Sequence, residues 1–307
     1  MASIIRLKQQ ETSQALAGAC CVFGVFDGLH RGHQALIAAA REDARRRGAQ
    51  CVVITFDRDP DELFRADKLR KLMTNEDRLN ALAESDVDCV VALQFDRDFA
   101  SEEPERFLDL AFGQNTPASM HVGYDLRFGY RAKGTVEDLR TWGQEHGMDV
   151  YGHDLVEDGG APITATRIRG LLAEGDIAQA NLLLGRPFRL CGQVQRGRGE
   201  GADMGFRTAN LSFDKTHQVL ADGVYSAYAL VDGVQYKAAV SMGVAPTFAD
   251  TAKATCEVHI LDFQGNLYGQ TIAVDFIARR RPMIKFDDVN ELIKTVMADI
   301  DWARESL

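Results

Sequence analysis

The chain has 307 residues, 46% of them hydrophobic and 26% charged, which is typical of a globular protein with room for two domains. Its 45 acidic and 35 basic residues give a net charge of −10, which disfavours attraction to nucleic acid. No apolar run approaches the ~20 residues of a membrane helix, and residues 1–6 lack the layout of a signal peptide. We therefore expect a cytoplasmic location, with neither a nucleic-acid nor a membrane partner.

The first half of the chain alternates short apolar segments with amphipathic ones. Helices are expected at 32–47 and from Thr74, which has Asp77 three residues later in a pattern close to a capping box. Strands that are apolar throughout and alternate with helices are typical of a parallel sheet covered on both faces. The sequence thus predicts an α/β N-terminal domain. Its expected strands are 20–26, 51–56, 88–93 and 120–123.

Six cysteines are present, and no two of them form a C-x-x-C pair. Four lie in apolar runs, where a free cysteine behaves as a small hydrophobic residue. This spacing predicts neither a disulfide framework nor a zinc site. The four are Cys20, Cys21, Cys51 and Cys89.

A change of pattern divides the chain. Residues 164–184 have a helical pattern in two pieces, interrupted at Gly175, and Gly185 then begins a Gly-Arg-Pro break. We place a domain boundary there, which gives domains 1–184 and 185–307.

The second half has short segments of alternating polarity separated by turn residues. Asp232-Gly233, between two such segments, is a strong β-hairpin signal. Regularly spaced short strands predict an antiparallel β-barrel, and 287–307 has the pattern of a closing amphipathic helix. The expected strands of this C-terminal domain are 225–231, 235–240, 254–261 and 271–276.

Residues 24–33, with the sequence GVFDGLHRGH, follow the first expected strand and lead into the first helix. Ligands bind at this edge of open α/β sheets, and a helix N-terminus offers free N–H groups to a phosphate. Gly28 and Gly32 allow the backbone to approach a ligand, and His30 and His33 project from the same side of a helical turn. Two imidazoles placed there can donate hydrogen bonds to a triphosphate. The alternative is a glycine turn with two surface histidines.

This string resembles the nucleotidyltransferase superfamily with an HxGH signature, whose members have a Rossmann-like fold and direct an attack on the α-phosphate of ATP. The resemblance implies catalytic roles for His30 and His33. It also implies that five neighbouring residues contact ATP and its phosphates: Gly24, Phe26, Asp27, Gly28 and Gly32.

Residues 163–169 (ITATRIR) are similar to the second signature of that superfamily, a Ser/Thr-rich turn followed by a basic helix start. We expect Thr166 to cap this helix. The resemblance implies that Arg167 and Arg169 hold the departing pyrophosphate. The alternative is an ordinary capped helix with two solvated arginines.

Residues 122–129 (VGYDLRFG) resemble the VGxDFRFG segment of the bacterial FAD synthetase branch of this superfamily. Residues 54–60 are similar to the TFDPHP segment of the same branch, with Arg58 and Asp59 in place of Pro and His. A tight turn after a strand is the alternative for the first segment. The resemblance implies flavin-binding roles for three of its residues, Gly123, Asp125 and Phe128.

Residues 192–210 resemble the riboflavin kinase signature GxVxxGxxxGRxLGFPTAN, with Ala202 in place of Arg and Arg207 in place of Pro. The resemblance implies that Thr208 and Asn210 provide oxygen ligands to the Mg²⁺ of MgATP. A flexible hairpin loop is the alternative. The resemblance also implies a loop over the phosphates, built on Gly197, Gly201 and Gly205.

Residues 256–263 (CEVHILDF) are similar to the VEVHLLDF strand of the same kinase family. This resemblance implies that Glu257 is the catalytic base, whereas an outward-facing charge on an alternating strand is the alternative. His259 is expected to be structural. Arg281 and Phe286 match the closing pattern of the family, which implies that Arg281 binds flavin or phosphate.

Together the resemblances cover the chain from about residue 24 to the C-terminal helix. They imply an enzyme that phosphorylates riboflavin to FMN and adenylylates FMN to FAD with release of pyrophosphate, using ATP and Mg²⁺. The changes at Ala202 and Arg207 lead to the hypothesis that the kinase is slow or partly degenerate. Two alternatives stay open: an adenylyltransferase whose second domain only binds flavin, and a non-catalytic flavin-binding regulator. The expected partners are riboflavin, FMN and ATP, and the sequence leaves a weak homo-oligomer open.

Overall fold

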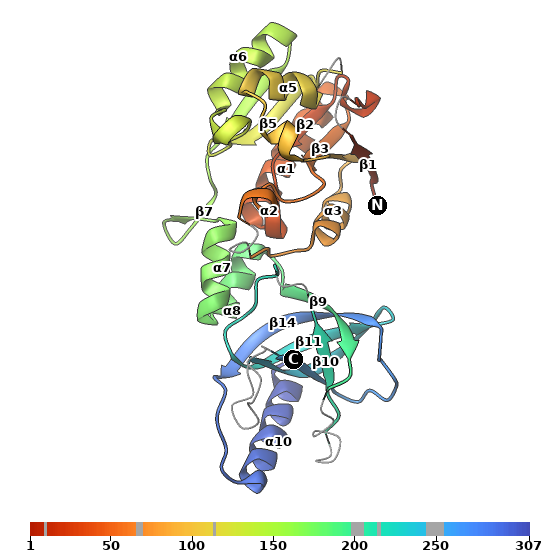
Figure 1. The fold of residues 1–307 in the computed structure, drawn as a ribbon, viewed down its shortest axis with the longest axis vertical. Helices are drawn as coiled ribbons and strands as arrows, with labels where there is room; N and C mark the ends of the chain where they lie inside the picture. The colour runs from red at the N-terminus through yellow and green to blue at the C-terminus, as the bar shows by residue number, and fades with distance from the viewer. Residues whose placement is uncertain (9–10, 66–69, 113–114, 198–205, 214–215, 244–254) are drawn as a thin grey trace. The chain divides into compact units, whose positions relative to one another are not determined.

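The computed structural model describes residues 1–307 apart from 9–10, 66–69, 113–114, 198–205, 214–215 and 244–254. The chain divides into two compact units, Met1–Ala165 and Thr166–Leu307 (Figure 1). Within the described ranges, no helix combines the length and the apolar character needed to span a membrane.

A six-stranded parallel sheet organises the first unit, with the strand order β1-β4-β3-β2-β5-β6. The strands β2, β3 and β4 are buried along their whole length, and the expected α/β fold is confirmed. The edge strands β1 and β6 escaped prediction because they are only partly buried and carry polar residues. The strands are β1 (Ser3–Leu7), β2 (Cys20–Phe23), β3 (Cys51–Phe56), β4 (Cys89–Leu93), β5 (Ser119–Gly123) and β6 (Asp149–His153).

Helices cover both faces of this sheet. One buried cluster joins Val22 of the sheet to Ile37 and Leu79 on α1 and α3, and a second joins the other face to α5 and α6. Thr74 caps α3 by accepting a hydrogen bond from the N–H of Asp77 (2.9 Å), as predicted. The longer helices are α1 (Arg31–Arg47), α3 (Asn75–Ala83), α5 (Pro104–Phe112) and α6 (Val136–His146). The short elements are η1 (Gln14–Leu16), η2 (Asp27–Leu29), α2 (Asp61–Phe64), α4 (Arg97–Ala100), η3 (Tyr130–Ala132), β7 (Glu157–Asp158) and β8 (Ala161–Pro162).

A closed six-stranded barrel forms the core of the second unit, and every neighbouring pair of its strands is antiparallel. The expected antiparallel barrel is therefore confirmed. Asp232 and Gly233 join β11 to β12 with φ values of 50° and 79°, the positive values that a tight hairpin turn requires. The strands are β9 (Phe188–Gln195), β10 (Ala209–Ser212), β11 (Gly223–Val231), β12 (Val234–Gly243), β13 (Thr255–Ile260) and β14 (Thr271–Arg281).

Within the residues that the structure describes, three further helices lie from the end of the first unit onward: α7 (Ala165–Glu174), α8 (Ile177–Leu184) and the C-terminal α10 (Val289–Ser306). The first two confirm the helical pieces expected on either side of Gly175. Asn181 of α8 is tied to the barrel, because its side chain donates to the carbonyl of Phe276 (2.8 Å) and accepts from the N–H of Phe188 (2.7 Å). Thus α8 packs on the barrel, and the predicted functional boundary at Gly185 stays a prediction.

Candidate active sites

The turn after β2 carries the first candidate site. β2 ends at Phe23, earlier than the sequence predicted, because the chain turns at Phe26, which adopts a left-handed conformation with φ of 61°. The buried ring of Phe26 packs edge-on against His33, with 5.2 Å between the ring centroids. A Cβ on Gly24 would lie 3.3 Å from the Phe26 ring, so glycine lets this ring fold back. The turn delivers the chain to the start of α1.

Asp27 and Gly28 anchor this turn to the segment that precedes α3. The Asp27 carboxylate accepts hydrogen bonds from the N–H of Leu72 (3.0 Å) and of Met73 (3.3 Å). Gly28 has φ of 76°, and a Cβ there would approach the Leu72 side chain to 2.6 Å. Both residues therefore shape the turn, and their contact with ATP stays a prediction.

His30 and His33 lie face to face at the N-terminus of α1. Their rings are stacked, with 3.7 Å between the centroids and 18° between the planes. His30 is buried at the N-cap position, and a Cβ on Gly32 would lie 3.2 Å from its ring. The structure thus brings the two predicted catalytic imidazoles together beside the free N–H groups of a 17-residue helix.

The surroundings of His33 favour its neutral form. Burial, together with the nearby His30 and Arg78, lowers the pKa of His33 well below its usual range. Within the described part of the chain, its buried Nδ1 has no hydrogen-bond partner. A neutral imidazole carries one N–H, so His33 can donate one hydrogen bond to a phosphate oxygen without carrying a charge.

Arg78, on α3, is a residue of this site that sequence reasoning missed. Its side chain is buried, and its guanidinium donates to the Val25 carbonyl (2.8 Å), the Thr55 hydroxyl (2.6 Å) and the Phe56 carbonyl (2.8 Å). Burial lowers the pKa of Arg78. Arg78 thereby ties together the chain where it leaves β2 and β3, next to the histidine turn. The available signal was an arginine beside Leu79 on the buried face of a predicted helix.

The predicted flavin segment follows β5. A Cβ on Gly123, the last residue of that strand, would lie 2.6 Å from a carboxylate oxygen of Asp125, so this carboxylate folds back over the strand end. Phe128 is buried against Phe107, with 5.5 Å between the ring centroids. Phe128 and Gly134 exchange backbone hydrogen bonds of 3.2 and 2.8 Å, which close the loop. The structure gives Phe128 a packing role, and its contact with flavin stays a prediction.

Thr166, Arg167 and Arg169 lie in the first turns of α7. Because α7 begins at Ala165, Thr166 is its second residue, and the prediction that Thr166 caps the helix is wrong. Alanine has the highest helix propensity, which favours the earlier start. The roles of Arg167 and Arg169 in holding pyrophosphate stay predictions.

Strand register defines the second candidate site. Asn210 on β10 pairs with Glu257 on β13, which in turn pairs with Ser241 on β12. Directly paired residues project from the same face of a sheet with their Cβ atoms about 5 Å apart. The next residues along these strands, Val240 and Val258, are fully buried in the barrel, so the row lies on its outer face. The predicted magnesium ligand and the predicted base are therefore side by side.

Thr208 lies directly before β10, in a segment that is held by the neighbouring strand. Nδ1 of His259 forms a hydrogen bond of 2.8 Å with the carbonyl of Arg207. This bond fixes the backbone next to Thr208 and gives His259 the structural role expected of it.

The surroundings of Asn210 fit a magnesium ion that is bound together with a nucleotide. A Cβ on Gly197 would lie 2.2 Å from the amide nitrogen and 2.9 Å from the amide oxygen of Asn210. A larger residue at position 197 would therefore clash with this side chain. Mg²⁺ is commonly held by one or two protein oxygens together with substrate phosphates and water. The other two glycines predicted for the phosphate loop, Gly201 and Gly205, lie outside the described residues.

Arg281, which was predicted to bind flavin or phosphate, is paired with a carboxylate of α10. Its guanidinium donates to Asp299 at 2.5 and 3.2 Å, and Arg280 lies 2.8 Å from the same side chain. Through Val224 on β11, the register also places Arg281 in the outer row that contains Glu257. Its contact with a substrate stays a prediction.

Two protein families match the chain, one for each unit. The FAD synthetase family matches residues 12–167, and the riboflavin kinase family matches residues 184–307. Among curated relatives, the bifunctional riboflavin kinase/FMN adenylyltransferase of Escherichia coli K12 is 35% identical over 95% of this chain and 94% of the relative. The protein of the same description from Pseudomonas fluorescens is 33% identical over 94% of this chain and 92% of its own.

A solved structure agrees with these matches in fold. It is a crystal structure from Streptococcus pneumoniae, described as a macrolide-efflux protein, which superposes with a TM-score of 0.86 at 32% identity over 98% of both chains. Both candidate sites, the order of the two family matches and the near-complete coverage of the relatives lead to one conclusion. The chain belongs to the family of bifunctional riboflavin kinase/FMN adenylyltransferases.

Proposed function

We propose that this chain phosphorylates riboflavin to FMN and adenylylates FMN to FAD, each reaction using ATP. The observation that carries this proposal is that two separate clusters of residues predicted to handle phosphate each lie inside the part of the chain that its own family matches. His30 and His33 stack at a helix N-terminus in one unit, and Asn210 and Glu257 pair across strands in the other.

In adenylyl transfer, a phosphate oxygen of FMN forms a bond to the α-phosphorus of ATP, and the bond from that phosphorus to the pyrophosphate oxygen breaks. Charge on the α-phosphate oxygens grows as the new bond forms. The single N–H of neutral His33 and the free N–H groups at the start of α1 would stabilise this charge. We propose that Arg167 and Arg169 hold the departing pyrophosphate, and that Gly123 and Asp125 contact the flavin.

In the kinase reaction, the primary hydroxyl of riboflavin forms a bond to the γ-phosphorus of ATP, and the bond to the ADP oxygen breaks. Glu257 would take the proton of that hydroxyl. Thr208 and Asn210 would hold Mg²⁺ by their side-chain oxygens, and the ion supplies positive charge to the transferring phosphoryl group. The register pair of Asn210 and Glu257 supports this division of roles, because the predicted magnesium ligand and the predicted base are neighbours across the strands.

Incubation with riboflavin, ATP and Mg²⁺, followed by chromatography, tests the proposal. We expect FMN to appear first and FAD to follow. FAD formed from added FMN but not from riboflavin would favour the adenylyltransferase with a degenerate kinase domain. No product from either flavin would favour the non-catalytic regulator. The absence of nucleic-acid and membrane partners and the cytoplasmic location remain predictions from the sequence.

A further inference from the structure

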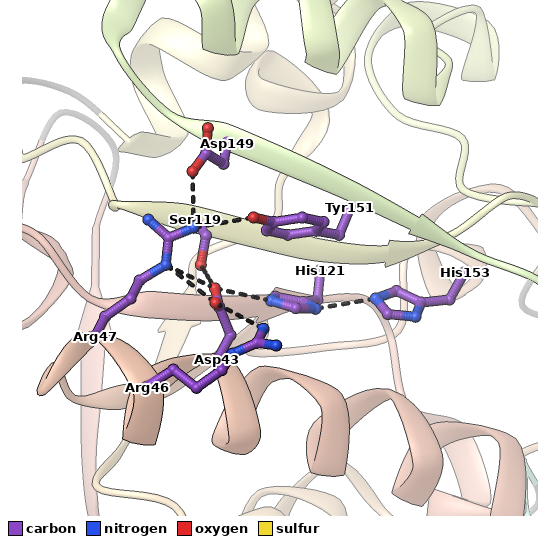
Figure 2. A network of polar contacts seen from close by, with 8 residues as sticks. All are labelled: Asp43, Arg46, Arg47, Ser119, His121, Asp149, Tyr151 and His153. Carbon is purple, nitrogen blue, oxygen red and sulfur yellow. Dashed lines mark hydrogen bonds and ion pairs between the residues drawn. The ribbon is translucent and has the colours of Figure 1, made fainter.

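A chain of polar contacts runs along the face of the parallel sheet that α1 covers (Figure 2). Asp43, which is buried on α1, accepts hydrogen bonds from the Ser119 hydroxyl (2.6 Å) and from Nε of Arg47 (3.0 Å). Nε2 of His121, on β5, lies 3.3 Å from the same carboxylate. Nδ1 of His121 lies 2.9 Å from Nε2 of His153, the last residue of β6. This network of contacts therefore connects the C-terminal half of α1 to the carboxyl end of the sheet.

This geometry fixes the position of the proton on each ring. An ionised carboxylate only accepts hydrogen bonds, so Nε2 of His121 carries its hydrogen and Nδ1 has a lone pair. His153 must then donate through Nε2, which leaves Nδ1 of His153 as an acceptor. This order of donors and acceptors requires both rings to be neutral. Burial lowers the pKa of both histidines, which favours the neutral rings at ordinary pH.

His153 also lies at the carboxyl end of the sheet, where the first candidate site is located. It pairs with Gly123, and the alternation along β5 places this pair on the same face as His121, which is the face covered by α1. His30 and His33 start α1, which begins at the carboxyl end of the sheet on that face.

The segment predicted to bind flavin begins beside His153. Its strand partner Gly123 has no side chain, and the Asp125 carboxylate lies over that glycine. The ring of His153 is half-buried, and across the described residues Nδ1 has no hydrogen-bond partner. The Nδ1 atom of His153, which carries no hydrogen and can only accept, thus borders the segment predicted to bind flavin.

We propose that His153 binds, through Nδ1, the N–H edge of a substrate heterocycle in the adenylyl-transfer site, and that His121 and Asp43 are positioning residues for it. This inference rests on the proposed function of the first unit. Both substrates of that reaction carry such an edge, the amino group of adenine in ATP and the imide N–H of the flavin in FMN. A site built to accept a hydrogen bond discriminates against an analogue that lacks the donor, because the acceptor is then left unpaired.

Two substitutions separate substrate binding from structural support. His153→Gln places an amide near the Nε2 position, which keeps a donor to His121 and removes the Nδ1 acceptor. His153→Asn does the reverse, because its amide oxygen can replace Nδ1. We expect His153→Gln to raise one of the two KM values of FAD formation about tenfold, the amount expected for one hydrogen bond, and His153→Asn to stay within about threefold of the wild type. A raised KM for FMN assigns the flavin, and a raised KM for ATP assigns adenine.

Substrate analogues test the same contact in the wild-type protein, where folding is not in question. Purine riboside triphosphate lacks the amino group of ATP, and N3-methyl-FMN lacks the imide hydrogen. We expect one of these analogues to show a KM about tenfold above that of its parent in the wild type, and the same KM as its parent in His153→Gln.

His146→Gln is the matched control, because His146 is exposed on α6 and stacks on Trp142 away from the network. Wild-type KM values in His153→Gln, or a larger rise in His153→Asn than in His153→Gln, would overturn the inference, since a purely structural histidine depends on its bond to His121. A wild-type protein that makes FAD but treats both analogues like their parents would overturn this inference alone. A wild-type protein that makes no FAD would overturn the proposed function as well.

Discussion

Replacing Arg78 by methionine removes the buried guanidinium and keeps most of the volume of the side chain. The arginine donates to the carbonyls of Val25 and Phe56 and to the hydroxyl of Thr55. The Val25 carbonyl keeps a second donor, because the Thr55 hydroxyl lies 3.3 Å from it. Two buried acceptors therefore lose their partner, and each costs about 1–3 kcal/mol, so we expect the first unit to lose about 4 kcal/mol of stability.

Fluorescence of Trp142 can report this loss separately from the second unit. The chain has two tryptophans, and Trp142 is buried in the first unit whereas Trp302 lies on α10. In a Trp302→Phe background, Trp142 alone reports urea unfolding of the first unit. With a slope of about 2 kcal/mol per M, a loss of about 4 kcal/mol lowers the midpoint by about 2 M.

Arg78→Met should also slow FAD formation more than FMN formation, because Val25 immediately precedes Phe26 in the histidine turn. Arg78→Lys is the matched variant. Its stability and its rate of FAD formation should fall between those of the wild type and those of Arg78→Met, since one ammonium cannot reproduce the planar fork of the guanidinium. An urea midpoint within about 0.3 M of the Trp302→Phe parent, with FAD formation unchanged, would refute the role assigned to Arg78.

Three further substitutions follow from the geometry. Gly28→Ala should reduce FAD formation at least tenfold and leave FMN formation intact, because its Cβ would approach Leu72 to 2.6 Å at φ of 76°; equal loss of both activities would contradict this. Gly197→Ala should reduce FMN formation at least tenfold and spare FAD formation from FMN, because its Cβ would lie 2.2 Å from the Asn210 amide; wild-type FMN formation would contradict this. Asp43→Asn should destabilise the first unit at pH 7, and by progressively less as the pH falls below about 4. Burial raises the pKa of Asp43, but its hydrogen bonds outweigh that effect and hold the pKa below its usual value. The stability it contributes is therefore present above about pH 4 and is lost as the pH falls through the lowered pKa, which urea midpoints across this range would check.

The overall fold was predictable because buried strands are apolar along their whole length. β3 was predicted residue for residue, because five of its six residues are apolar and the sixth, Thr55, is β-branched. The edge strands β1 and β6 were missed, because a half-exposed strand carries polar residues that interrupt the apolar pattern. The start of α7 was misjudged by two residues, because a cap at Thr166 would begin the helix at Arg167 and the helix begins at Ala165.

The candidate sites were predictable only where they follow the chain. His30 and His33 are three positions apart, and helical geometry alone brings them to one side. Arg78 reaches Val25 across a separation of 53 residues, and His121 reaches Asp43 across 78. No local pattern encodes such contacts, because they depend on which strands and helices become neighbours in the folded sheet. For Asn210 and Glu257, family resemblance supplied the expectation, and the strand register placed the two residues together.

The most direct test of two separate sites is a cross-complementation of His33→Gln with Glu257→Gln. We expect His33→Gln to make FMN and no FAD, and Glu257→Gln to make FAD from FMN but nothing from riboflavin. A mixture of the two proteins, supplied with riboflavin, ATP and Mg²⁺, should then produce FAD. Loss of both reactions in either folded variant, or a mixture that stops at FMN, would contradict the division of the chemistry between two independent sites.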